Sequence, residues 1–138
     1  MKSISAILFF ISLILFSSCG NSDDLGAKIA GKWNMKKVEE LSKDVTAIHN
    51  PDNNRWIRFI NDAGDKNRGT FESGSGDVKE NSGKWYYYEK DNELFIDSDA
   101  GEDDDSYWEV LIKDNTMYWK GRRFEFNKRF EIFYHRDN

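Results

Sequence analysis

The feature that most constrains the fold of this chain is an alternation of apolar and polar side chains near its carboxyl end. From residue 124 to residue 134 the even positions are apolar except Lys128, and the odd positions are mostly polar. Successive side chains of a β-strand point to opposite faces, whereas a helix would scatter these residues around its circumference. The pattern therefore predicts a strand with one buried and one wet face, or two strands joined by a bend near Asn127.

Shorter patterns of the same kind recur along the chain. Runs of β-branched or aromatic residues alternate with breaks of Gly, Asn and Asp, and the chain has a single Pro. These features favour antiparallel β-structure. The expected strands are residues 31–38, 55–60, 69–71, 85–88, 94–96, 107–112, 116–120 and 124–134. They predict an all-β fold, an eight-stranded antiparallel up-and-down β-barrel, in which residues 39–54 form one long connection with a helical turn or a lid.

Composition narrows the function classes. The chain has 138 residues with 20 Lys and Arg against 25 Asp and Glu, which gives a net charge of −5. That length suits one domain. The acidic balance, with no block of basic residues, argues against nucleic acid as a partner, because such proteins neutralise many phosphates. The single Cys excludes an internal disulfide framework and any multi-Cys metal site.

The first residues predict an export signal. Residues 4–16 are apolar except for two Ser and follow Lys2, which fits a secretory signal and is too short to span a bilayer. Ser17 and Ser18 then precede Cys19, an order that resembles a bacterial lipoprotein signal. It implies removal of residues 1–18 and acylation of Cys19, which would anchor the chain to a membrane by lipid alone. The alternative is an ordinary signal peptide followed by an incidental free cysteine.

Residues 19–27 read as the acylated cysteine and a polar tether, and residues 28–138 as the barrel domain. The pair Asp23-Asp24 resembles the tag with which Bacteroidetes-type bacteria place lipoproteins on the cell surface. The expected location is therefore the outer membrane, on its periplasmic or its outer face, and not the cytoplasm.

Two Gly-Lys-Trp triplets carry a family resemblance. Gly31-Lys32-Trp33 opens the first expected strand, and Gly83-Lys84-Trp85 is followed by a turn and Leu94-Phe95-Ile96. A Gly-x-Trp on the first strand of a small barrel resembles the lipocalin signature, and residues 28–135 are similar in layout to short lipocalin-like lipoproteins of Bacteroidetes. The resemblance implies that Trp33 packs across the closed end of the barrel. It also implies a basic side chain stacked over that Trp, for which Arg129 and Arg136 are both candidates.

If Trp33 points inward, the alternation places many aromatic side chains inside the barrel. They could fill it completely or line an apolar pocket with few polar anchors, as small-molecule sites do. Three basic residues, Lys37, Arg55 and Lys128, fall on the inner parity. Such a cation could bind a carboxylate head group near the mouth or extend to water. The expected ligand-binding residues are Trp33, Met35, Arg55, Phe59, Trp85, Tyr87, Trp108, Trp119, Phe126 and Lys128.

Six carboxylates are concentrated within residues 97–105. Ca²⁺ takes six to eight oxygen ligands, so Asp97, Asp99, Glu102 and Asp103 are a weak calcium candidate, although the spacing does not match an EF-hand. The alternative is a solvated, self-repelling loop. No other metal site and no cofactor is predicted.

Catalysis is not expected, because the chain has two His residues and none of the motifs for zinc or acyl chemistry. The leading interpretation is an exported, lipid-anchored, lipocalin-like protein that binds a small apolar or amphipathic ligand. The alternative is a structural or protein-binding cell-surface module, in which a filled barrel presents Trp56, Tyr86, Tyr88 and Tyr118 from its outer face.

Overall fold

Strands dominate the computed structural model, which describes residues 25–122 and 129–137. In chain order the elements are α1 (Leu25–Ile29), β1 (Gly31–Glu40), β2 (Lys43–Asp44), α2 (Thr46–His49), β3 (Arg55–Asp62), β4 (Asp65–Ser75), β5 (Val78–Tyr88), the 3₁₀ turn η1 (Glu89–Asp91), β6 (Glu93–Ser98), the 3₁₀ turn η2 (Glu102–Asp104), β7 (Ser106–Lys113), β8 (Thr116–Gly121) and β9 (Phe130–His135).

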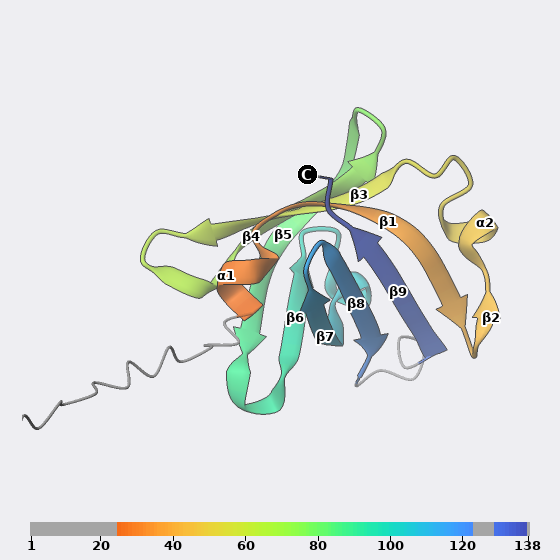
Figure 1. Cartoon of the computed structure of the whole chain (residues 1–138). Helices are drawn as coiled ribbons and strands as arrows, with labels where there is room; N and C mark the ends of the chain where they lie inside the picture. Colours follow the sequence, from red (N-terminus) through yellow and green to blue (C-terminus); the bar gives the residue numbers. More distant parts are fainter. Residues whose placement is uncertain (1–24, 123–128, 138) are drawn as a thin grey trace, which may run out of the picture.

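The sheet closes on itself. β1 and β3 to β9 pair antiparallel in sequential order, and β9 returns to pair with β1. Figure 1 shows the orange β1 lying beside the blue β9. The predicted eight-stranded up-and-down barrel is thus confirmed, and the two-residue β2 is a short addition beside β1.

Several strand ends differ from the prediction. β4 and β5 extend well beyond residues 69–71 and 85–88. The additional parts are rich in Gly, Ser and charged residues, so they carry no apolar alternation from which a strand could be predicted. β9 begins at Phe130, and the predicted strand residues 124–128 lie outside the described residues. Asp114 and Asn115 form the turn between β7 and β8, and the helical turn expected within residues 39–54 is α2.

Aromatic side chains fill the centre of the barrel. Trp33 and Trp85 are fully buried, and Phe59 makes an edge-to-face contact with Trp85 at 5.8 Å between ring centroids. At Gly83 a Cβ would lie 2.1 Å from the carbonyl oxygen of Asp97, so only glycine allows β5 and β6 to approach this closely. The inward parity inferred from the sequence therefore holds for most of the core.

β1 contains an exception to that parity. Met35 pairs with Tyr134 and Lys37 with Phe133, so Lys36 is an extra residue in a β-bulge. Beyond the bulge, each side chain of β1 points to the opposite face from the one that strict alternation predicts. Val38 is consequently buried, and the prediction that Lys37 points inward is wrong: its ammonium lies 2.5 Å from Glu39 and over the ring of Phe133 on the outer face.

One end of the barrel, called here the closed end, is sealed by α1, Trp33 and Arg136. The indole Nε1 of Trp33 donates to the carbonyl oxygen of Ile29 at 2.7 Å. The Arg136 guanidinium lies 4.0 Å from the Trp33 ring centroid and donates to the carbonyl oxygen of Lys28 at 2.6 Å. Of the two candidate cations, Arg136 therefore stacks on Trp33, while Arg129 pairs with Glu40 on the surface.

α1 begins at Leu25 and so includes residues 25–27, which the polar composition assigned to the tether. Leu25 and Ile29 lie one turn apart on the same face of the helix, and both are buried in the core. The carbonyl oxygen of Gly26 also accepts a hydrogen bond from Asn61 of β3 at 3.1 Å. Apolar burial and backbone hydrogen bonds together hold this helix against the barrel.

The closed end gives a stability prediction. Replacing Arg136 with Gln removes the cation–π contact and the charged hydrogen bond to Lys28, so the free energy of unfolding should fall by about 1–2 kcal/mol in urea titrations. Replacing Arg129 with Gln removes only an exposed ion pair and should change that energy by less than about 0.5 kcal/mol. Equal effects of the two changes would contradict the assignment of Arg136 to the seal.

Candidate functional site

The opposite, open end of the barrel contains two adjoining hollows of about 180 Å³ each. Met35, Arg55 and Trp108 line both of them. The first hollow has an apolar wall that includes Trp119 and Tyr134, and a polar wall of Ser73, Asn81 and Ser106. The second lies between the barrel and α2 and is lined further by Val38, His49, Phe130 and Ile132.

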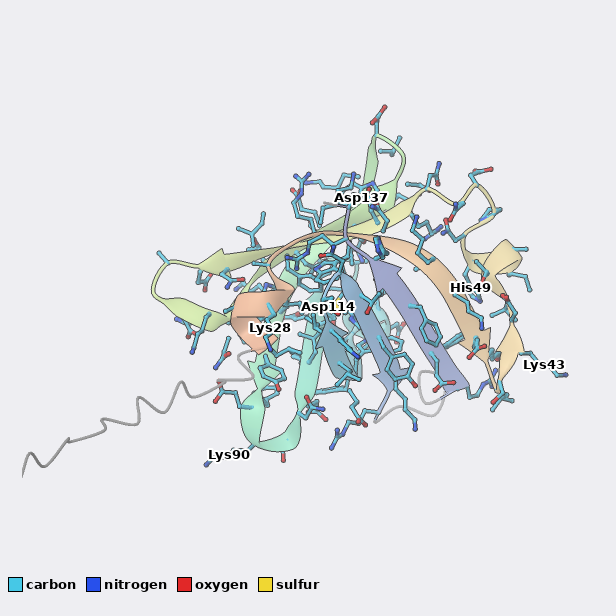
Figure 2. The ribbon with its side chains drawn as sticks, viewed as in Figure 1. Lys28, Lys43, His49, Lys90, Asp114 and Asp137 are labelled. Atoms are coloured by element: carbon cyan, nitrogen blue, oxygen red, sulfur yellow. The ribbon has the colours of Figure 1, made fainter. Side chains whose placement is uncertain are left out.

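The hollows exist because β1 separates from β3. Pairing between the two strands ends at Asn34 and Trp56, and the bulge at Lys36 bends β1 towards β9. The connection that carries α2 spans the gap, and Figure 2 shows His49 on it, far from Lys28 and Asp114 at the closed end. An opening in the barrel wall is thus created by two irregularities of a single strand.

Asn50 holds that connection in place. It is buried, its Nδ2 donates to the carbonyl oxygen of Met35 at 3.0 Å, and its Oδ1 accepts from the backbone N–H groups of Asn54 and Arg55, each at 3.0 Å. One side chain therefore replaces the missing ladder between β1 and β3. Apolar alternation does not reveal this residue, although Asn before Pro51 is a turn signal.

Arg55 stands at the mouth of the hollows. Its side chain is about half exposed, and its Nη1 lies 3.5 Å from Glu80 Oε2. Burial raises the pKa of the Tyr134 hydroxyl far above its usual range, and the positive charge of Arg55 only partly offsets this. Arg55 and Tyr134 both line the first hollow, and the Tyr134 phenol stays neutral near neutral pH.

One ring of the lining, that of Trp119, carries a buried hydrogen-bond donor. Trp119 is 4% exposed, and its Nε1 has no hydrogen-bond partner within residues 25–122 and 129–137. Trp108, by contrast, donates from its Nε1 to Ser106 Oγ at 2.7 Å. A buried donor without a partner is costly, but the Trp119 Nε1 has almost no exposed surface, so it lies behind the wall of the hollow.

The predicted ligand-binding residues divide into three groups. Met35, Arg55, Trp108 and Trp119 meet at the open-end hollows. The core and the closed end hold Trp33, Phe59, Trp85 and Tyr87. Phe126 and Lys128 lie outside the described residues, as does Cys19, the predicted acylation site.

A hollow of about 250 Å³ also lies at the closed end, between α1 and β7. Its lining includes Leu25, Lys28 and Tyr87, and the Tyr87 hydroxyl donates to Asn92 Oδ1 at 3.1 Å. The polar groups there are engaged within the protein. The open end is the better candidate, since Arg55, three polar side chains and several apolar rings line one hollow there.

The four calcium candidates lie on β6 and the β6–β7 connection. Asp99 accepts a hydrogen bond from Ser82 Oγ at 2.8 Å, and Glu102 and Asp103 lie in the exposed turn η2. In the described part of the chain, no three His, Cys, Asp or Glu side chains are grouped so that they could hold a metal ion. The calcium hypothesis therefore gains no geometric support there.

The aromatic residues expected outside are on the outer face. Trp56 lies under the Lys32 ammonium, which is 4.9 Å from its ring centroid, and Tyr118 packs against Phe133 with the two rings tilted by 45°. Tyr86 begins a row of stacked rings that continues through Phe95 and Tyr107, with centroid distances of 6.1 and 4.4 Å. Tyr88 is 46% exposed.

Among the described residues no helix is long and apolar enough to cross a membrane.

Asn50 provides a test of how the mouth is built. Asn50→Ala leaves two backbone N–H groups and one carbonyl without their partner, so the free energy of unfolding should fall by about 2–3 kcal/mol. The exposed neighbour Asp52 serves as a control, and Asp52→Ala should change it by less than about 0.5 kcal/mol. Urea titration followed by tryptophan fluorescence measures both, and a neutral effect of Asn50→Ala would contradict its bridging role.

Comparison of the chain with protein-family models, with curated proteins and with solved structures gives no match. The lipocalin-like interpretation rests on the Gly31-Lys32-Trp33 triplet and on a closed, sequentially paired barrel that is compatible with it.

Proposed function

We propose that this chain is an exported, lipid-anchored, lipocalin-like protein. It binds a small amphipathic ligand at the open end of its barrel and does not catalyse a reaction of that ligand. The observation that carries the proposal is the first hollow, where the rings of Trp108, Trp119 and Tyr134, the cation of Arg55 and the polar side chains of Ser73, Asn81 and Ser106 line one space. An apolar surface with a few placed polar groups is the usual composition of a small-molecule site.

The size of the hollows limits the ligand. A cavity of about 150 Å³ accommodates a benzene ring, and each open-end hollow is slightly larger. The ligand is therefore a compact molecule with one ring or a short chain and a polar end that accepts hydrogen bonds.

The alternative, a protein-binding surface module, is favoured by the outer row of Tyr86, Phe95 and Tyr107. These rings are nearly parallel, so they stack mainly on one another and offer their edges to a partner. The two functions can be distinguished by substitutions: ligand binding should respond to substitutions inside the mouth, and binding of a protein partner to substitutions on the outer face.

Met35→Trp tests the ligand site, because a larger side chain at this half-buried position fills space in both hollows. We expect unmodified protein to bind 4-phenylbutanoate with a dissociation constant of roughly 0.01–1 mM by calorimetry. Met35→Trp should weaken binding at least about tenfold. Thr70→Trp, at an exposed position of β4, should leave it unchanged. Equal binding by all three proteins would place the interaction outside the mouth.

The lipid anchor is tested separately. In a bacterial host with lipoprotein processing, the mature protein should begin at Cys19 and carry acyl chains, visible as an added lipid mass on its first peptide. Cys19→Ser should release the protein from the membrane fraction, since the anchor is the acyl group. Membrane association that survives this change would contradict the anchor. Protease shaving of intact cells then tells the outer face from the periplasmic face.

A further inference from the structure

An ion pair crosses the mouth of the open end. Arg55 on β3 and Glu80 on β5 lie 3.5 Å apart, and their side chains are 45% and 42% exposed. The two strands are not neighbours, because β4 lies between them. The pair therefore bridges over the end of β4 and depends on where each side chain is aimed.

A second β-bulge places Glu80 there. On β4 and β5, Ser73 pairs with Asn81 and Gly74 with Lys79, so Glu80 is the extra residue. Bulges redirect side chains and are common beside binding sites. The next residue, Asn81, lines the first hollow. The bulge thus sets a carboxylate beside the mouth.

In the ion pair, Glu80 occupies the Arg55 guanidinium, which is the charge that an anionic ligand would bind. Among the described residues that line the two hollows, Arg55 carries the only permanent charge. Half-exposed ion pairs contribute little to stability, so Arg55 can exchange one carboxylate for another at small cost. A guanidinium presents its donors in a planar fork that matches both oxygens of a carboxylate.

Building on the proposed function, we infer that the ligand is a small carboxylic acid and that Glu80 is its built-in competitor. In the free protein Glu80 pairs with Arg55. When the acid binds, its carboxylate takes the place of Glu80 on Arg55, and its ring or short chain enters the hollow lined by Met35 and Trp108. The Glu80 carboxylate then points into solvent, which is possible because its side chain is already partly exposed.

Glu80→Gln tests this inference with a matched control. The probes are 4-phenylbutanoate and its neutral amide, 4-phenylbutanamide, measured by calorimetry. Unmodified protein should bind the acid about tenfold tighter than the amide, because the amide lacks the charged hydrogen bonds to Arg55. Glu80→Gln should strengthen binding of the acid about threefold and leave the amide unchanged.

Glu72→Gln is the control, because Glu72 pairs with Arg58 and Lys79 away from the hollows. It removes the same charge from β4 and should leave both probes unchanged. Arg55→Gln should abolish the preference for the acid. Circular dichroism confirms that each variant is folded.

The outcomes separate the two levels of the proposal. If neither probe binds any variant, the proposed function itself is wrong. If both probes bind unmodified protein equally, or if Glu80→Gln and Glu72→Gln have the same effect on the acid, the binding function stands and the competition by Glu80 is overturned.

Discussion

The pairing of β9 with β1 is the interaction on which the rest of this structure depends. It turns a sheet with two free edges into a cylinder, so the inward side chains of eight strands must fill one enclosed volume. Trp33, Phe59 and Trp85 provide that filling with a few large rings. A chain with modest numbers of aliphatic residues can therefore build a dense core.

The candidate site arises where this regular arrangement is interrupted. One bulge lets β1 bend away from β3, a second aims Glu80 across the mouth, and Asn50 supplies the hydrogen bonds that the separated strands lack. Each interruption opens space or directs a polar group without breaking the barrel. The contacts of Trp33, Arg136 and α1 that stabilise the barrel and the hollows that form the candidate site thus lie at opposite ends of the barrel.

Period-two alternation was sufficient to predict the barrel and most of its inward residues, because burial imposes that pattern directly. It failed at Lys37, since one extra residue in a strand reverses every later side chain and leaves no trace in composition. Asn50 and Glu80 were missed for a similar reason: their roles depend on strands that are distant in the sequence. Inner parity predicted that Met35, Arg55, Trp108 and Trp119 face the interior, and in the structure these four side chains line the first hollow.

The junction of α1, Trp33 and Arg136 has a consequence for the order of folding. It joins the carbonyl oxygen of Lys28 to a side chain 108 positions later in the chain. Contacts so remote in sequence form slowly, because a long loop must close before they are made. A ribosome releases Arg136 108 residues after Lys28, so a growing chain can pair its early hairpins long before Arg136 can reach α1.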